Sequence, residues 1–153
     1  MANAIDHIES FHYNAYLLAP ILERFYEFSI EKDKNILLSY LVLPLLLYPE
    51  SRNKLKTANI KSSIYTIFSD QTILYGLNER IENFSAITNK CLLLLVNEGS
   101  IKINESMSVT YLSKKMDMSL CNKDIVRASK NISILFNSHE IVEVFRKLGV
   151  KKI

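Results

Sequence analysis

Residues 36–48 read ILLSYLVLPLLLY, thirteen positions with very few polar side chains. A membrane-spanning helix needs about 20 apolar residues, so this run is too short, and Pro44 interrupts it. A helix that is apolar on every side belongs in the centre of a protein or in a protein–protein interface. The run therefore predicts the core of a helical domain. It should end at Tyr48, because Pro49 disfavours helix at the residue before it.

Helical spacing of apolar residues continues on both sides of this run. Before it, a helix is predicted within residues 11–30 with Asn14 as N-cap, and Pro20 either kinks this helix or restarts it. After it, the spacing predicts helices over residues 49–55, 60–68, 73–96, 125–136 and 141–148. Ser138 should cap the last helix and Gly149 should end it.

The apolar period changes from helical to alternating over residues 101–111. This alternation, with a turn at 104–106, predicts a β-hairpin. Gly and Pro number only 3 each, which argues against an all-β sandwich or barrel. We therefore expect residues 1–153 to form one mainly α, compact domain with one small β-hairpin.

The order helix, helix, hairpin makes residues 60–112 winged-helix-like. In such units the helix before the hairpin usually reads DNA. Here that helix carries Glu79 and Glu82, which phosphates would repel. We expect this long helix to pack on protein rather than enter a DNA groove.

The arrangements that catalysis needs do not stand out in the sequence. His7, His12 and His139 lack the partners of a metal site, and 3 glycines are too few for a glycine-rich phosphate loop. Glu23 and Glu27, four apart, are interpreted as a solvated helix face. We therefore expect no catalytic residue, no metal, no cofactor and no enzymatic activity.

The sequence also indicates a cellular compartment. The first residues lack a basic region followed by an apolar run, which is the pattern of a signal peptide. Cys91 and Cys121 lie among apolar neighbours and are interpreted as buried thiols in a reducing compartment. We expect a cytoplasmic protein without membrane contact.

Basic side chains around and after the hairpin are the best candidates for nucleic-acid contact. They are Lys102, Lys114, Lys115, Lys123, Arg127 and Lys130. The last three share a helix face at spacings of four and three. A solvated basic face is the simpler interpretation, since the net charge is only +3. Because no base-reading motif accompanies them, any binding should be through phosphates and independent of sequence.

Aromatic and apolar residues of the first half are candidates for partner contact. The set is Tyr13, Tyr16, Tyr26, Leu43, Pro44, Tyr48 and Arg52. Aromatic side chains left on a surface often anchor a partner, although most of this cluster is expected to be core. Arg52 is either an ordinary surface residue or pairs with a buried carboxylate, of this chain or of a partner.

Three passages carry a resemblance to a known family. Residues 13–18 (YNAYLL) open the first helix, with Ala15 where the family usually has proline. Residues 41–48 (LVLPLLLY) are followed by Ser51-Arg52, and the long helix is followed by residues 99–101 (GSI) and the hairpin. Over residues 11–148 the chain resembles the middle components of bacterial three-component ABC systems. That group includes the small subunit of Lamassu-type antiphage defence.

The resemblance implies a non-catalytic adaptor, either a kleisin-like or an accessory subunit. It would bind an SMC-like coiled-coil ATPase of the ABC type and link it to an effector, often a nuclease, in defence against phages or plasmids. DNA would be reached through the complex, with weak backbone contact by this chain as an addition. The alternative is a stand-alone winged-helix DNA-binding regulator, which should form symmetric dimers and bind DNA alone in a salt-sensitive way.

Overall fold

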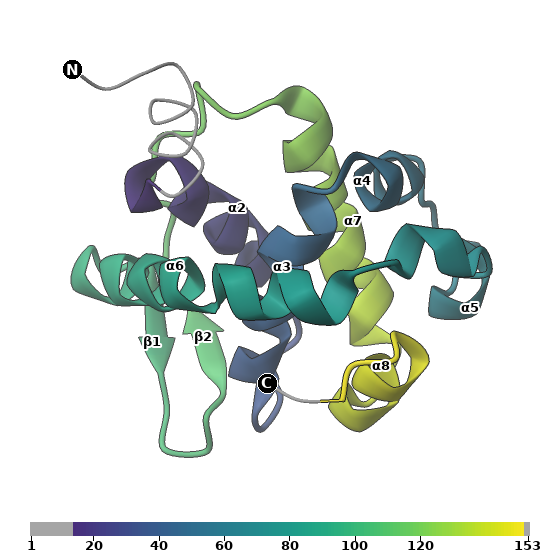
Figure 1. Cartoon of the computed structure of the whole chain (residues 1–153). Coiled ribbons are helices and arrows are strands. Elements are labelled where there is room, and N and C mark those ends of the chain that lie inside the picture. Colours follow the sequence, from purple (N-terminus) through teal and green to yellow (C-terminus); the bar gives the residue numbers. More distant parts are fainter. Residues whose placement is uncertain (1–13, 152–153) are drawn as a thin grey trace.

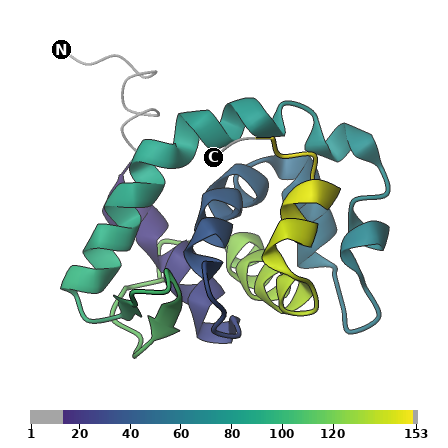
Figure 2. The ribbon, with the colours of Figure 1, turned by 90° about the horizontal axis from the view of Figure 1, so that it is seen from below.

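The apolar run lies at the centre of the molecule. In the computed structural model, which describes residues 14–151, helix α3 (Ser39–Leu46) is surrounded by α2 (Ala15–Phe28), α4 (Pro49–Lys56), α6 (Leu77–Asn97) and α7 (Lys123–Asn137) (Figures 1 and 2). Every residue from 41 to 46 is buried. The run therefore forms the core of this chain, one of the two environments that its composition predicted.

The remaining elements are short. They are the 3-10 helices η1 (Asn35–Leu38) and η2 (Gln71–Leu74), α5 (Ile64–Ile67), strands β1 (Ile101–Ile103) and β2 (Val109–Tyr111), and α8 (Ile141–Lys147). The predicted fold class, mainly helical with one small hairpin, is confirmed. Within residues 14–151, no helix combines the length and the apolar character needed to cross a membrane.

Helices α2 and α7 are joined by buried hydroxyl groups. Asn14 caps α2 as predicted, its side chain accepting a hydrogen bond from the backbone of Tyr16 at 2.9 Å, and the helix continues through Pro20. On α7, Ser129 and Ser133 lie one turn apart, and each donates a 2.6 Å hydrogen bond to a backbone carbonyl of α2. These small side chains allow the two helices to pack closely.

Glu23 contradicts the interpretation of a solvated carboxylate pair. Its side chain is 2% exposed. It accepts hydrogen bonds from the Ser100 hydroxyl at 2.6 Å and from the backbone N–H groups of Lys115 and Met116 at 3.0 and 3.2 Å. The interpretation was wrong because the segment after β2 folds back over α2. Glu23 thereby ties α2 to both ends of the hairpin, whereas Glu27 remains half-buried at the surface.

The hairpin is held along the body of the protein. Its strands pair antiparallel, with Ile103 opposite Val109. The backbone N–H of Val109 donates to the buried Asn35 side chain at 2.6 Å, and that of Ile36 donates to the Met107 carbonyl at 3.2 Å. The turn is therefore fixed by the segment that precedes α3, rather than standing free as a wing would.

Three predicted boundaries are corrected. The long helix starts at Leu77 rather than 73, because Gly76 adopts a left-handed conformation (φ 72°) that interrupts the apolar pattern. Helix α5 covers only four residues, and Ile60, predicted to lie on it, is 96% exposed in the preceding loop. Ser138 ends α7 instead of capping α8, since Glu140 occupies the cap position.

Candidate interaction surfaces

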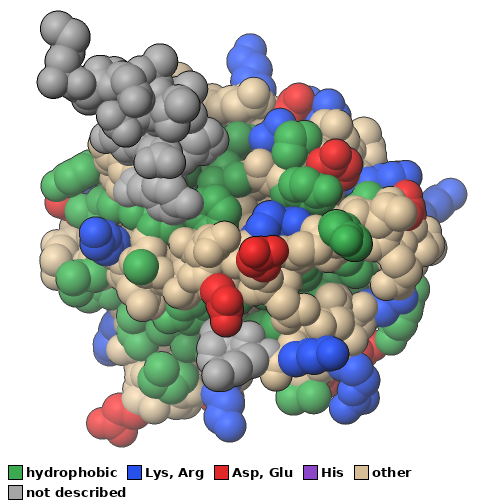
Figure 3. Space-filling model, in the orientation of Figure 1, with side chains coloured by type: hydrophobic (Ala, Val, Ile, Leu, Met, Phe, Trp, Pro, Cys, Tyr) green, Lys and Arg blue, Asp and Glu red, His purple; other side chains and the backbone are tan. Residues whose placement is uncertain are grey.

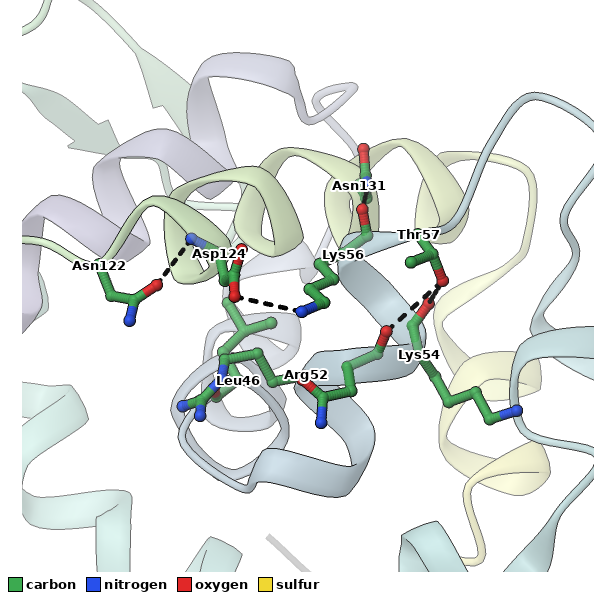
Figure 4. Close-up of polar contacts among 9 residues, drawn as sticks. Leu46, Arg52, Lys54, Lys56, Thr57, Asn122, Asp124 and Asn131 are labelled. Atoms are coloured by element: carbon green, nitrogen blue, oxygen red, sulfur yellow. Dashed lines mark hydrogen bonds and ion pairs between the residues drawn. The ribbon is translucent and has the colours of Figure 1, made fainter.

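The Ser51-Arg52 pair completes the end of α3. The last carbonyl groups of a helix have no partner within the helix and must find one elsewhere. The Ser51 hydroxyl donates to the Leu45 carbonyl. Arg52 Nη1 donates to the Leu46 carbonyl at 3.5 Å, and Figure 4 shows these two residues. The chain has to turn here because of Pro49. The pair therefore stabilises the turn between α3 and α4 and keeps the buried helix end satisfied.

Arg80 supplies a third partner for the end of α3. Its Nε donates to the Pro44 carbonyl at 3.1 Å, and its guanidinium lies over the ring of Tyr48, 3.9 Å from the centroid. A second nitrogen donates to the Tyr75 carbonyl. Arg80 lies on the helix that a winged-helix protein would place in DNA. Here its side chain is directed into the protein instead.

The structure removes three residues from the predicted partner-contact set. Tyr26 and Leu43 are 1% and 0% exposed, and Pro44 is buried. The Tyr26 hydroxyl donates to the Asn35 carbonyl at 3.2 Å, and burial raises the pKa of this phenol. A side chain without exposed surface cannot contact a partner in this conformation. These three residues are therefore core, because four helices close around the apolar run.

The other candidates differ in exposure. Tyr16 is 68% exposed and available to a partner. Tyr48 is half-buried beneath Arg80, and Arg52 is half-buried against α3. None of the ion pairs within residues 14–151 includes Arg52, so its predicted carboxylate partner is not found within that range. Tyr13 lies outside the described residues.

An exposed apolar surface, absent from the predicted set, lies where α6 meets the hairpin. It consists of Leu93, Val96, Ile103 and Leu112, which are 62%, 38%, 36% and 53% exposed, and we call it the α6–hairpin surface. These side chains border a groove of about 580 Å³. Hydrophobic side chains are visible at the surface around α6 and the hairpin in Figure 3.

One sequence signal could have revealed this surface. Residues 92–95 are four consecutive leucines, and successive residues of a helix point about 100° apart. Four in a row therefore cannot all face one core. Leu92 and Leu95 are buried, while Leu93 faces outward. A helix end with leucine on nearly all sides is typical of a segment that contacts something on its second face.

A second surface is positively charged, and we call it the basic groove. It is an open groove of about 880 Å³, lined by Lys123, Arg127 and Lys130 from α7, Arg24 from α2 and Lys56 from α4. Sequence reasoning found the three α7 residues and missed the other two. Arg24 and Lys56 lie far from α7 in sequence, and only the packing of α2 and α4 against α7 brings them to it.

The remaining predicted nucleic-acid residues lie elsewhere. Lys102 lines the groove of the α6–hairpin surface. Lys115 lines a separate small pocket with Tyr16, and its backbone N–H binds Glu23. Lys114 is exposed and is not among the residues that line the basic groove. The six basic residues therefore do not form one continuous surface.

The walls of the basic groove are fixed by polar contacts between α4 and α7 (Figure 4). Asn131 Nδ2 donates to the carbonyls of Leu55 and Lys56 at 2.9 and 3.2 Å, so it satisfies the end of α4. Lys56 Nζ lies 3.2 Å from Asp124, and Asn122 caps α7 by accepting from the Asp124 N–H at 2.7 Å. The groove is therefore preformed by the fold.

A family model described as "ABC-three component (ABC-3C) system Middle Component 3" matches residues 2–152. The chain belongs to this family. The match confirms the resemblance and extends beyond the passages that first carried it. No curated protein and no solved structure matches the chain significantly.

Membership in a family of middle components has one direct consequence. Such a protein works within a system of several components, so it has partner proteins. Within residues 14–151 of this middle component, no group of three His, Cys, Asp or Glu side chains could hold a metal ion. His7 and His12 lie outside that range. The α6–hairpin surface and the basic groove are its two candidate sites of contact.

Proposed function

We propose that this middle component is a non-catalytic, kleisin-like or accessory adaptor. It binds an SMC-like ABC-type ATPase and links it to an effector such as a nuclease, in cytoplasmic defence against phages or plasmids. The observation that carries the proposal is the exposed α6–hairpin surface on a protein that belongs to a multi-component system. We assign this surface to the ATPase contact.

The α6–hairpin surface has the properties of an interface core. The core of a protein–protein interface is apolar, depleted of charge and rimmed by polar groups. Leu93 and Leu112 supply the apolar centre, while Lys102 and Asn89 line the same groove as polar neighbours. Burying one exposed leucine contributes about 1.5–3 kcal/mol before the costs of association. A small cluster of this kind can provide much of the binding free energy.

The hairpin side of this surface is also tied to the body of the protein by hydrogen bonds, which favours docking. Glu23 binds residues on both sides of the hairpin, and Asn35 binds Val109 within it. A preformed surface avoids the entropy loss of ordering loops when a partner binds. The buried polar groups Glu23, Asn35 and Ser51 are engaged with backbone or hydroxyl partners. This supports the non-catalytic part of the proposal, since these groups serve the fold.

The alternative function, a stand-alone DNA-binding regulator, has less support. It requires α6 to present polar side chains to DNA. Arg80 instead donates a hydrogen bond to the Pro44 carbonyl. The Asn78 side chain donates to the Gly149 carbonyl and accepts from the Lys151 backbone N–H. Figure 3 shows acidic side chains over α6, which would repel phosphates.

Co-purification tests the adaptor proposal. The tagged chain is expressed with the ABC ATPase and effector encoded beside it and is captured at low and at high salt. The wild type should retain the ATPase at high salt, because an apolar contact is little screened. The variant Leu93→Asp/Leu112→Asp should lose it while keeping its melting temperature.

The matched control changes two exposed apolar residues elsewhere. Ile60 and Val142 are 96% and 66% exposed, and neither lines the groove of the α6–hairpin surface. Ile60→Asp/Val142→Asp should retain the ATPase. Equal loss in both variants would exclude the α6–hairpin surface as the contact, and a wild-type chain that elutes without any partner would contradict the adaptor function.

A further inference from the structure

Three cations of the basic groove have no acidic partner among the described residues. The ion pairs within residues 14–151 include Arg24 with Glu27 at 2.8 Å and Lys56 with Asp124 at 3.2 Å, but not Lys123, Arg127 or Lys130. These three line a preformed groove from one face of α7. The groove therefore carries a net positive charge that the protein leaves uncompensated.

Two positive groups are held against one aromatic ring at the groove. Arg24 Cζ and Lys130 Nζ lie 4.6 and 4.7 Å from the centroid of the Phe28 ring. Each contact with the ring is favourable, but the two like charges repel each other. Arg24 Nε is in addition buried without a hydrogen-bond partner. Glu27 already pairs with Arg24 at 2.8 Å, so an anion in the groove would relieve the repulsion chiefly at Lys130, which has no acidic partner among the described residues.

The spacing of the unpaired cations suits a repeating anion. Lys123, Arg127 and Lys130 follow each other at four and three positions, so the row is about 10 Å long. One strand of a duplex presents a phosphate about every 3.4 Å along its axis. With one cation for each phosphate, the three side chains of the row can neutralise about three phosphates. The positive end of the α7 dipole lies at the same place.

The lining of the groove distinguishes between kinds of anionic partner. None of its described lining residues is aromatic, whereas proteins that bind single strands stack bases on aromatic side chains. Its apolar lining residues, such as Val126 and Met118, are half-buried, so the groove lacks the exposed apolar anchors of a protein interface. Its exposed lining residues include the cations Lys123 and Arg127 and the hydroxyl residues Thr57 and Ser119, which suit a backbone of phosphates.

We propose that the basic groove binds the phosphate backbone of a nucleic-acid duplex, independently of base sequence. This is a binding site additional to the adaptor function, and it does not use the α6–hairpin surface. Its centre is Lys123, Arg127 and Lys130, with Arg24 and Lys56 completing the wall. The chain would thereby hold DNA directly, beside whatever contact its partners make.

The test measures binding of the full-length chain to a fluorescent DNA duplex of random sequence by anisotropy, over a range of salt concentrations. With about three phosphates neutralised, affinity should fall roughly forty-fold between about 50 and 200 mM salt. The variant Lys123→Glu/Arg127→Glu/Lys130→Glu should weaken binding at least about ten-fold and remove most of the salt dependence. The corresponding Gln variant should lose the same salt dependence with a smaller change of charge.

The control is Lys90→Glu/Arg146→Glu/Lys151→Glu, which changes the net charge equally at exposed positions outside the basic groove and outside the α6–hairpin surface. It should weaken binding no more than about three-fold. Circular dichroism and the melting temperature show whether each variant folds. If the Glu variant is misfolded, the DNA affinity and salt dependence of the Gln variant test the proposal instead.

Several outcomes would overturn the proposal. The first is that the wild type does not bind the duplex at low salt, and the second is that the groove and control variants lose affinity for DNA equally. The third is that a single strand binds more tightly than the duplex. The fourth is that polyglutamate competes as strongly as DNA. The last would assign the groove to an acidic protein segment. The groove variant should still co-purify with the ATPase, so failure of the adaptor proposal and failure of this one give different results.

Discussion

Helices α3 and α6 both carry leucines near their C-terminal ends, but these leucines lie in opposite environments. Leu45 and Leu46 of α3 are fully buried, whereas Leu93 of α6 is 62% exposed. Helix α3 is enclosed by four helices, whereas α6 packs on α2, α3 and the hairpin and leaves one face of its C-terminal part uncovered. Residue type is the same in both places. The difference shows that the number of elements packed around a helix, rather than its composition, decides which leucines form core and which form a surface.

The largest contrast should come from shortening one leucine in each region. Leu43→Ala leaves a cavity in the centre of the core and should lower the free energy of unfolding by about 3 kcal/mol. Leu93→Ala should change it by no more than about 0.5 kcal/mol, because the side chain is mostly in water already. Urea denaturation of both variants provides the measurement. Similar losses in the two would contradict the assignment of α3 as core and α6 as surface.

Removing the buried carboxylate of Glu23 should have the next largest effect on stability. Glu23→Ala leaves the Ser100 hydroxyl and two backbone N–H groups without their acceptor, and should destabilise the fold by about 3 kcal/mol or slightly less. Glu27→Ala removes a half-exposed ion pair with Arg24 and should lower stability by less than about 1 kcal/mol. Thermal and urea unfolding compare the two. If Glu23→Ala left the free energy of unfolding unchanged, the hairpin would not depend on this carboxylate.

Arg52 separates a structural from an interaction function at the end of α3. If it serves only to satisfy the Leu46 carbonyl, Arg52→Ala should lower stability by about 1 kcal/mol and leave co-purification with the ATPase unchanged. If it is a partner contact, the complex should be lost while stability is retained. The two measurements, unfolding and co-purification on the same variant, decide between these functions.

The smallest expected effect concerns the two cysteines. Burial raises the pKa of Cys91 to about 12, and the half-buried Cys121 also has a raised pKa because of burial. A raised pKa keeps a thiol protonated at neutral pH, and the protonated form does not react as a nucleophile. Alkylation of the native protein at mildly alkaline pH, followed by mass spectrometry, should label Cys121 well before Cys91. Equal rates would contradict the greater burial of Cys91.

Local sequence rules predicted the elements with strong patterns. The apolar run, the Asn14 cap and the hairpin were all predicted within a few residues of their bounds, because each depends on neighbours in the chain. The start of α6 was misplaced because the apolar spacing continues across Gly76 without a break in pattern. The row on α7 was found for the same reason, since spacings of four and three place side chains on one helix face.

The sequence by itself determined that this chain is mainly helical, that its central run is buried and that a cationic row lies on one helix. Those properties follow from periodicity and polarity, which are local. Only the tertiary structure decided that Glu23 is buried, that Arg24 and Lys56 join Lys123 in one groove, and that Leu93 stays exposed. These depend on which distant segments pack together, because a side chain becomes buried, or joins a charged groove, only when another element covers or approaches it.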